Sequence, residues 1–133
     1  MEIKARSISR GTASGEALIS REPIGFLGGV DPQTGVVMEK GHSLEGRCVA
    51  GKVLIFPHGK GSTVGSYVML QLAKNSKAPA AIINTSAEPI IAVGAIISRI
   101  PMVDRPGKDV YKILKDGQRL EVDGTKGMVK ILS

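Results

Sequence analysis

The fold of this chain is decided by one stretch, Pro57-His58-Gly59-Lys60-Gly61-Ser62-Thr63-Val64-Gly65-Ser66. The four residues before it, Val53–Phe56, are apolar and largely β-branched or aromatic, which predicts a buried strand. The apolar pattern after it favours a helix over residues 63–74, and residues 80–83 are typical of a second strand. We therefore expect this stretch to be the turn of a β-loop-α-β unit with parallel strands.

Two glycines give this turn its chemical interest. Gly59 and Gly61 permit either a positive φ or a close approach of the backbone to a ligand. The first amide groups of a helix have no intrahelical acceptor, so they are available to an anion. Ser62 is expected at or beside the N-cap, and Lys60 adds a cation. The turn thus suits an anion, or a hydroxyl group that loses its proton, although local features alone favour simple capping by Ser62.

The same stretch is not a phosphate-binding P-loop. That motif requires Gly-x-x-x-x-Gly-Lys-Ser/Thr. Here Gly61 follows Lys60, and Leu54 stands where the first glycine of the motif would be.

Length and composition indicate a compact domain with an aliphatic core. The chain has 133 residues, 3% aromatic residues and no Trp, so Ile, Val, Leu, Ala and Met must fill its interior. No apolar run approaches the roughly 18 residues that a membrane-spanning helix needs. The first residues also lack the apolar block of a signal peptide. We expect a soluble, cytoplasmic protein that forms a single domain over residues 1–133.

The net charge of +6 is compatible with nucleic-acid binding. The cations are spread along the chain rather than clustered, and the chain has almost no aromatic side chains on which bases could stack. The charge fits an anionic small substrate or an acidic partner at least as well.

Cysteine and histidine are too few for a metal centre. The chain has one cysteine, Cys48, and two histidines, His42 and His58, so it can form neither a disulfide nor a recognisable zinc site. An iron–sulfur cluster needs three or four thiolates. We expect no metal in this chain, a buried thiol at Cys48 and a structural role for His42. His58 is expected to be either a satisfied loop histidine or a group that supports the turn.

The remaining chain predicts short elements around the central βαβ unit. The expected helices cover residues 89–93, ended by Gly94, and 109–115. Residues 100–103 are expected to form an edge strand because of Pro101. Further β segments are expected at 3–9, 15–20, 24–30 and 36–38, followed by a terminal hairpin of 119–122 and 128–131 that turns at Asp123-Gly124.

Four motifs occur in an order that resembles a known family. They are FLGGVDPQTG at 26–35, HSLEG at 42–46, PHGKGS at 57–62 and APAAII at 78–83. Together with the terminal strand, these motifs make nearly the whole chain similar to the small, swivelling subunit of the aconitase X group. The resemblance implies an α/β fold of the swivelling β/β/α type. It also implies a large partner subunit that carries a 4Fe–4S cluster.

The resemblance also implies an activity and site residues. Free-standing subunits of this kind belong to a hydro-lyase that dehydrates 5-phosphomevalonate to trans-anhydromevalonate 5-phosphate in archaeal isoprenoid synthesis. The catalytic serine of the family falls on Ser62, which would accept the proton from carbon. From the residues themselves we expect Lys60, Gly61, Gly28 and Gly29 to line the substrate cleft, since glycines permit a close approach of the backbone. Lys60 could hold the substrate phosphate or could simply be solvated.

One difference from the wider aconitase pattern limits the expected range of substrates. Other classes of function stay open. The wider aconitase pattern has an arginine two residues after the serine, where it grips a carboxylate, and this chain has Val64. A di- or tricarboxylate substrate is therefore not expected, whereas a hydroxyproline-like substrate is an alternative. A non-catalytic docking or carrier domain is a further alternative. A phosphohistidine carrier would have to use His58.

Overall fold

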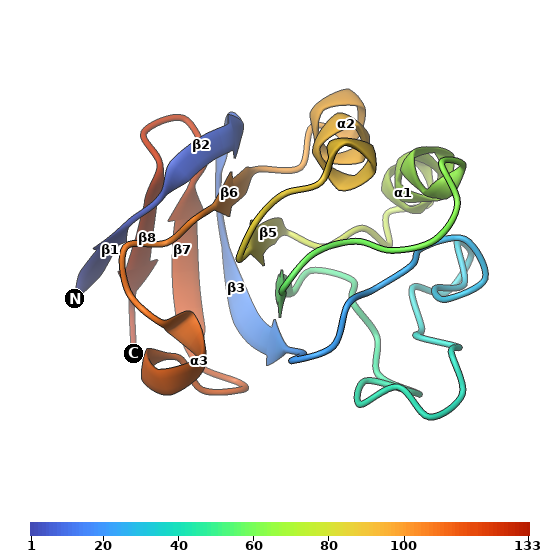
Figure 1. Cartoon of the computed structure of the whole chain (residues 1–133), viewed down its shortest axis with the longest axis horizontal. Helices are drawn as coiled ribbons and strands as arrows, with labels where there is room; N and C mark the ends of the chain where they lie inside the picture. Colours follow the sequence, from blue (N-terminus) through green and yellow to red (C-terminus); the bar gives the residue numbers. More distant parts are fainter.

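The computed structural model describes residues 1–133, which form strands on one side and two long helices on the other (Figure 1). The strands are β1 (Glu2–Lys4), β2 (Arg6–Ser9), β3 (Thr12–Ile19), β4 (Val53–Phe56), β5 (Ala81–Asn84), β6 (Met102–Asp104), β7 (Arg119–Asp123) and β8 (Met128–Ile131). The helices are α1 (Gly65–Lys74), α2 (Pro89–Ser98) and α3 (Val110–Ile113).

The strands form one sheet that curls until its two ends meet. Their order is β1-β8-β7-β3-β4-β5-β6-β2. The two end strands, β1 and β2, are separated in sequence only by Ala5, whose amide donates to the carbonyl of Gly127 at 2.8 Å. The first nine residues thus join both ends of the sheet, and no long strand edge is left free.

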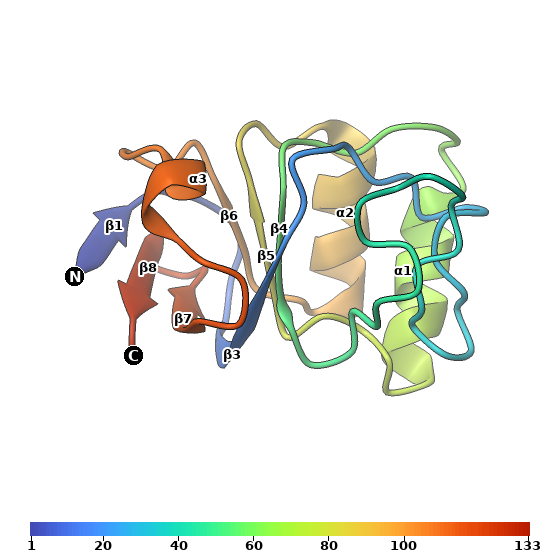
Figure 2. The ribbon, with the colours of Figure 1, turned by 90° about the horizontal axis from the view of Figure 1, so that it is seen from below.

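The middle of the sheet is buried on both faces. Along β4, Leu54 and Phe56 belong to the core beneath α1 and α2, whereas Val53 and Ile55 face the interior of the curled sheet. Figure 2 shows α1 and α2 together on one side of the parallel strands and β7 and β8 on the other. A strand buried on both faces is continuously apolar, which is the pattern that identified β4 in the sequence.

The expected α/β architecture is confirmed. β3, β4, β5 and β6 pair in parallel, with Val53 opposite Ala81 in the β4–β5 ladder. The terminal hairpin of β7 and β8 is also present, with Leu120 opposite Ile131. The βαβ unit around the glycine turn therefore lies at the centre of the molecule.

The expected end of the helix after Pro89 is wrong. α2 continues through Gly94 to Ser98, and Arg99 then adopts a left-handed φ of 58°. Gly94 does not end the helix because it is the site of close contact with α1. A Cβ at Gly94 would lie 3.2 Å from Ser66 Cα and still closer to the sulfur of Met69. The glycine reflects helix–helix packing, which the local sequence does not reveal.

Two expected strands, at 24–30 and 36–38, are also wrong. This region is a series of turns with isolated bridges, such as Ile24 with Gly59 and Val36 with Cys48. Phe26 and Val37 are buried and anchor the loop in the core beneath the helices, whereas Leu27 and Met38 are exposed. Burial of the side chains, without a neighbouring strand, produced the β-like pattern.

Smaller corrections concern β6 and α3. β6 is not an edge strand, because it lies between β5 and β2. Pro101 precedes the strand and accepts a hydrogen bond from Ile82 N at 2.9 Å, so its missing amide costs nothing there. α3 spans only Val110–Ile113, since Leu114 turns to an extended backbone and buries its side chain in the interior core.

An ion pair between the half-exposed Arg6 and the buried Asp104 ties the start of the chain to the loop before α2. Asp104 is fully buried and accepts from Arg6 Nε at 2.8 Å, from Arg6 Nη2 at 2.7 Å and from Ala87 N at 2.7 Å. Burial alone would raise the pKa of Asp104, but the hydrogen bonds from Arg6 and Ala87 outweigh it. The pKa of this carboxyl therefore lies below its ordinary value.

We expect Asp104 to make stability sensitive to acid. A group with a lowered folded-state pKa stabilises the protein above its unfolded pKa of about 3.9, and this stabilisation is lost as pH falls through the folded pKa. Asp104→Asn should lower the free energy of unfolding near neutral pH by about 1.5–3 kcal/mol, because it weakens charge-assisted hydrogen bonds. It should also flatten the acid dependence. Urea unfolding between pH 7 and pH 3 tests both results, and an unchanged pH profile would contradict this role.

None of the helices has the length and apolar character required to span a lipid bilayer.

Candidate functional site

The glycine turn lies at the carboxyl edge of the parallel strands. β4 ends at Phe56, and its continuation is fixed to the end of β5 by three hydrogen bonds. Asn84 Nδ2 donates to Phe56 O at 3.0 Å, and the amides of Thr85 and Ser86 donate to Pro57 O at 3.0 and 3.2 Å. Ligands of parallel α/β sheets, whether open or closed, bind beyond the carboxyl ends of the strands. The fold therefore presents the turn where a ligand is expected.

Gly59 is buried between the loop before it and the start of α2. Its φ is not positive, so it is a glycine for reasons of space. A Cβ at this position would lie 2.6 Å from Glu88 Oε1 and still closer to Ile91 Cγ1. Glu88 cannot easily move away, because its carboxylate caps α2 by accepting from Ile90 N and Ile91 N. The close approach is thus to α2 rather than to a ligand.

Ser62 lies in the exposed part of the turn. Gly61, with a φ of 88° and no atom near its side-chain position, redirects the backbone just before it. Ser62 Oγ accepts from Val64 N at 3.1 Å. The expectation of a Ser62 N-cap needs correction, because α1 begins at Gly65 and its N-cap is Val64, without a side-chain cap bond.

The backbone of the turn offers unused donors. The amides of Gly61, Ser62 and Thr63 donate to no other group of the chain. They stand beside the Ser62 hydroxyl, ahead of the positive end of α1. The free donors favour negative charge here.

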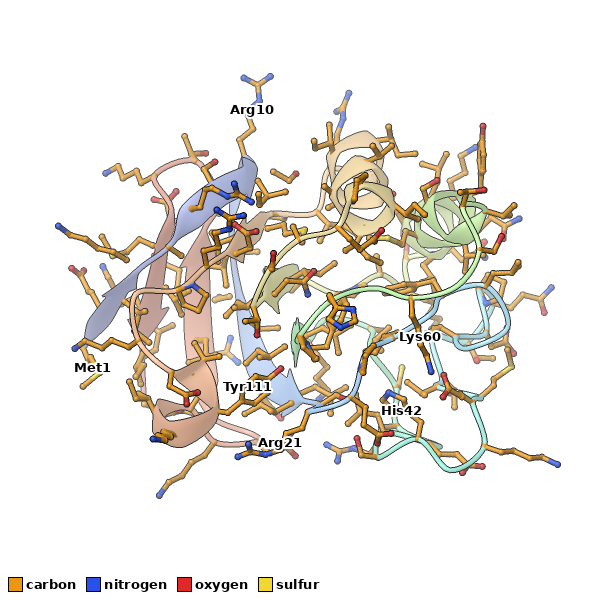
Figure 3. All side chains as sticks on the ribbon, viewed as in Figure 1. Met1, Arg10, Arg21, His42, Lys60 and Tyr111 are labelled. Atoms are coloured by element: carbon orange, nitrogen blue, oxygen red, sulfur yellow. The ribbon has the colours of Figure 1, made fainter.

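Lys60 is paired with an acidic side chain. Its Nζ donates to Glu39 Oε2 at 2.8 Å, and Figure 3 shows it directed toward the loop that carries His42. Glu22 is a second acidic side chain near Lys60. The hydrogen bond from Ser43 N, with a smaller contribution from the charge of Lys60, lowers the pKa of Glu22. Lys60 is therefore neither free nor simply solvated.

The two histidines are accommodated differently. His42 is buried, its Nδ1 accepts from Leu44 N at 3.0 Å, and its Nε2 lies 3.0 Å from Pro23 O. This arrangement places the proton on Nε2 and leaves no ring atom for a ligand, in agreement with a structural role. His58 is exposed and its Nδ1 lies 2.8 Å from Gly59 O.

The loop of residues 24–30, which contains Gly28 and Gly29, lies beside the turn. Ile24 N donates to His58 O at 3.3 Å, and Lys60 N donates to Ile24 O at 3.1 Å. Gly28 follows shortly after with a φ of 78° and open space around it, whereas Gly29 is buried. Gly28 is therefore open to a ligand, and Gly29 shapes the loop behind it.

The expectation of a buried thiol at Cys48 is wrong. Its thiol is exposed rather than buried, and it donates weakly to Thr34 O at 3.4 Å. No group of three or more His, Cys, Asp or Glu side chains gathers anywhere in a form that could hold a metal ion.

Sequence reasoning missed the acidic side chains around the turn. Glu39 and Glu22 come from the irregular loop, and Glu88 comes from the start of α2. Glu88 alone carried a local signal, since it precedes Pro89 at a helix start. Nothing in the sequence near Glu39 indicates a pairing with Lys60, because the loop has no periodic pattern from which its path could be derived.

The fold and the turn define a class of protein: a β/α domain that presents a serine, with free backbone amides, at the carboxyl edge of its parallel strands. A family model described as the aconitase X swivel domain matches residues 2–131. This chain belongs to the aconitase X swivel domain family.

Curated relatives and a solved structure agree with this family. A phosphomevalonate dehydratase small subunit from Methanosarcina mazei is 63% identical over 132 residues, covering 99% of this chain and 92% of the relative. A protein of the same name from Thermococcus kodakarensis is 56% identical and covers 99% of this chain and 97% of its own. The crystal structure of Thermococcus kodakaraensis aconitase X in its holo-form has a chain with a TM-score of 0.94 and 55% identity, with 100% and 99% coverage.

Proposed function

We propose that this chain is the small subunit of a hydro-lyase that dehydrates (R)-5-phosphomevalonate to trans-anhydromevalonate 5-phosphate. The observation that carries the proposal is identity of 63% to a phosphomevalonate dehydratase small subunit over 99% of this chain. Residues 1–133 act as one swivelling domain of a cytoplasmic complex in the mevalonate pathway.

In this proposal Ser62 is the proton acceptor. Its hydroxyl is exposed and close to three free amides, which are donors for an anion that develops at the turn. The N-terminal end of a helix stabilises an anion by about 2 kcal/mol at most. Since one pK unit is about 1.36 kcal/mol, this amounts to roughly one and a half units. Ser62 therefore needs exclusion of water and further positive charge, which only the assembled enzyme supplies.

The proposal assigns the 4Fe–4S cluster to a large partner subunit. The donors of this chain do not fit such a cluster, because Cys48 is its only thiol. The chemistry at the departing hydroxyl group consequently belongs to the partner. This chain contributes the proton acceptor and one wall of the substrate cleft, made by Lys60, Gly61 and Gly28, whereas the buried Gly29 shapes the loop behind this wall.

The residue at the position of the aconitase arginine, Val64, supports the choice of substrate. Val64 is exposed and carries no charge, so it offers nothing to a carboxylate two residues beyond Ser62. A phosphorylated substrate fits the turn better, because free amides and a lysine side chain are ligands for phosphate.

Anaerobic reconstitution tests the proposal. The chain would be mixed with the cluster-loaded large subunit from the same genome and assayed with 5-phosphomevalonate, with a hydroxyproline as the competing substrate. We expect turnover of 5-phosphomevalonate only when both subunits are present. Dehydration of the hydroxyproline alone would replace the proposed substrate, and inactivity with both compounds would overturn the proposal.

We further predict that Lys60 contributes to substrate binding. Lys60→Ala should raise KM about 10–100-fold with a smaller change in kcat, because a hydrogen bond to a charged group contributes about 1.5–3 kcal/mol. Glu39→Gln is the matched control, since it removes the ion pair of 2.8 Å but keeps the lysine. Steady-state kinetics of the complex distinguish the roles. An equal effect of both substitutions would mean that Lys60 acts only as the partner of Glu39.

A further inference from the structure

The outer face of α2 is apolar although nothing in the chain covers it. The helix, Pro89–Ser98, contains no charged residue. Three of its large side chains are about half exposed: Val93 at 49%, Ile96 at 54% and Ile97 at 45%. Its opposite side, with Ile91 and Ala95, is fully packed in the core. A helix that is apolar on all sides is normally buried on all sides.

A hollow of about 810 Å³ adjoins this face. It lies between α2 and β2 and is lined by Ser7, Ile8, Ser9, Arg10, Gly11, Ile96 and Arg99. Ile96 is shared by the hollow and the apolar face, so the two form one surface, which we call the α2 surface.

Two unpaired cations border the α2 surface. Neither the Arg10 nor the Arg99 guanidinium has a hydrogen-bond or salt-bridge partner within the chain, and no acidic residue lines the hollow. Figure 3 shows Arg10 extending away from the body of the molecule. By contrast, Arg6 at the start of β2 donates to Asp104 through both Nε and Nη2.

We propose that the α2 surface is the docking surface for the large subunit, which brings an apolar segment flanked by carboxylates; this rests on the function proposed above. The apolar side chains fit the apolar segment, and the two arginines fit the carboxylates. A small ligand alone would leave Val93 and Ile97 uncovered. The occupant is therefore a protein surface.

The area that a stable interface buries also favours a contact that extends from the α2 surface to the turn that carries Ser62. A stable interface buries about 800 Å² on each partner, against a total accessible surface of 6519 Å² for this chain. A ten-residue helix is about 15 Å long, so its outer face alone is too small. α1 packs beside α2 and exposes Tyr67 at 63%, and the N-cap residue Val64, two positions after Ser62, is 45% exposed. The docked large subunit therefore also covers the start of α1, and it excludes water from the turn that carries Ser62.

Isothermal titration of the chain with the purified large subunit, without substrate, tests the docking surface. Ile97→Glu should weaken binding by at least about tenfold, which corresponds to about 1.4 kcal/mol. Arg10→Glu should weaken it at low salt and reduce the salt dependence of the affinity. The matched control is Leu132→Glu, because Leu132 is 46% exposed but lies after β8. It should bind like the unmodified chain.

The possible outcomes distinguish an error in the docking surface from an error in the proposed function. Circular dichroism of each variant must match the unmodified chain. If Ile97→Glu and Arg10→Glu bind normally, the docking surface is wrong while the proposed function stands. If the unmodified chain does not bind the large subunit, both proposals fail. Light scattering that shows a dimer converted by Ile97→Glu to a monomer would assign the surface to a second copy of this chain and overturn the proposal.

Discussion

Ser62→Ala should yield a complex that assembles normally and has lost nearly all dehydratase activity. Loss of a general base costs about 10²–10⁴-fold in rate. The expected cost in stability is small, because Ser62 is exposed and its hydroxyl accepts only one hydrogen bond, from Val64 N at 3.1 Å. A serine that caps a helix contributes about 0.5–2 kcal/mol, but Ser62 is not the N-cap of α1, which is Val64.

Neighbouring hydroxyl groups provide the controls for Ser62. Thr63→Ala and Ser66→Ala remove hydroxyls on either side of the α1 start, and Ser66 Oγ donates only to Thr63 O at 3.3 Å. Both should have much milder effects on turnover. The measurements are kcat of the reconstituted complex and its affinity for the large subunit. If the Ser62→Ala complex keeps more than about a tenth of normal turnover, its loss falls outside the general-base range and Ser62 is only structural.

An isolated-subunit experiment separates this catalytic role from metal binding. We expect that the chain alone, after anaerobic reconstitution with iron and sulfide, binds no cluster, since one thiol is too few. Iron and sulfide analysis of the desalted protein gives the result directly. A stoichiometric cluster in the isolated chain would contradict the assignment of the cluster to the partner.

The central βαβ unit could be predicted because its signals are local. The continuous apolar runs of β4 and β5 and the glycines between them identify parallel strands and a turn, and both strands lie within a residue of where they were expected. The alternating residues of β7 and β8 identify the hairpin for the same reason. Periodicity is strongest where an element is regular.

The errors arise where distant contacts decide the local structure. Gly94 ends no helix because Met69 and Ser66 of α1 need its small volume. Within residues 24–38, the core contains Ile24, Phe26, Val30 and Val37, although this region does not pair as strands. The ion pair between Lys60 and Glu39 joins a turn to an irregular loop 21 residues away. No local pattern encodes such contacts.

Gly59→Ala should damage the site through the position of the turn. The substitution adds one methyl group at a backbone that alanine can adopt, so its effect is purely steric. That methyl would lie 2.6 Å from Glu88 Oε1 and closer to Ile91. Ile91 is buried, and Glu88 is held by the amides of Ile90 and Ile91. The turn must therefore move away from α2, and Ser62 moves with it.

The expected loss of activity for Gly59→Ala is about 10²-fold, because a displacement of about 1 Å in a catalytic group has an effect of this size. Overpacking should also lower the free energy of unfolding by about 1–3 kcal/mol. Gly41→Ala is the matched control: Gly41 has a φ of 81° and open space around it. It should lose about 1–2 kcal/mol through backbone strain but retain its turnover. If both variants lose stability and neither loses activity, the contact between Gly59 and α2 does not position Ser62.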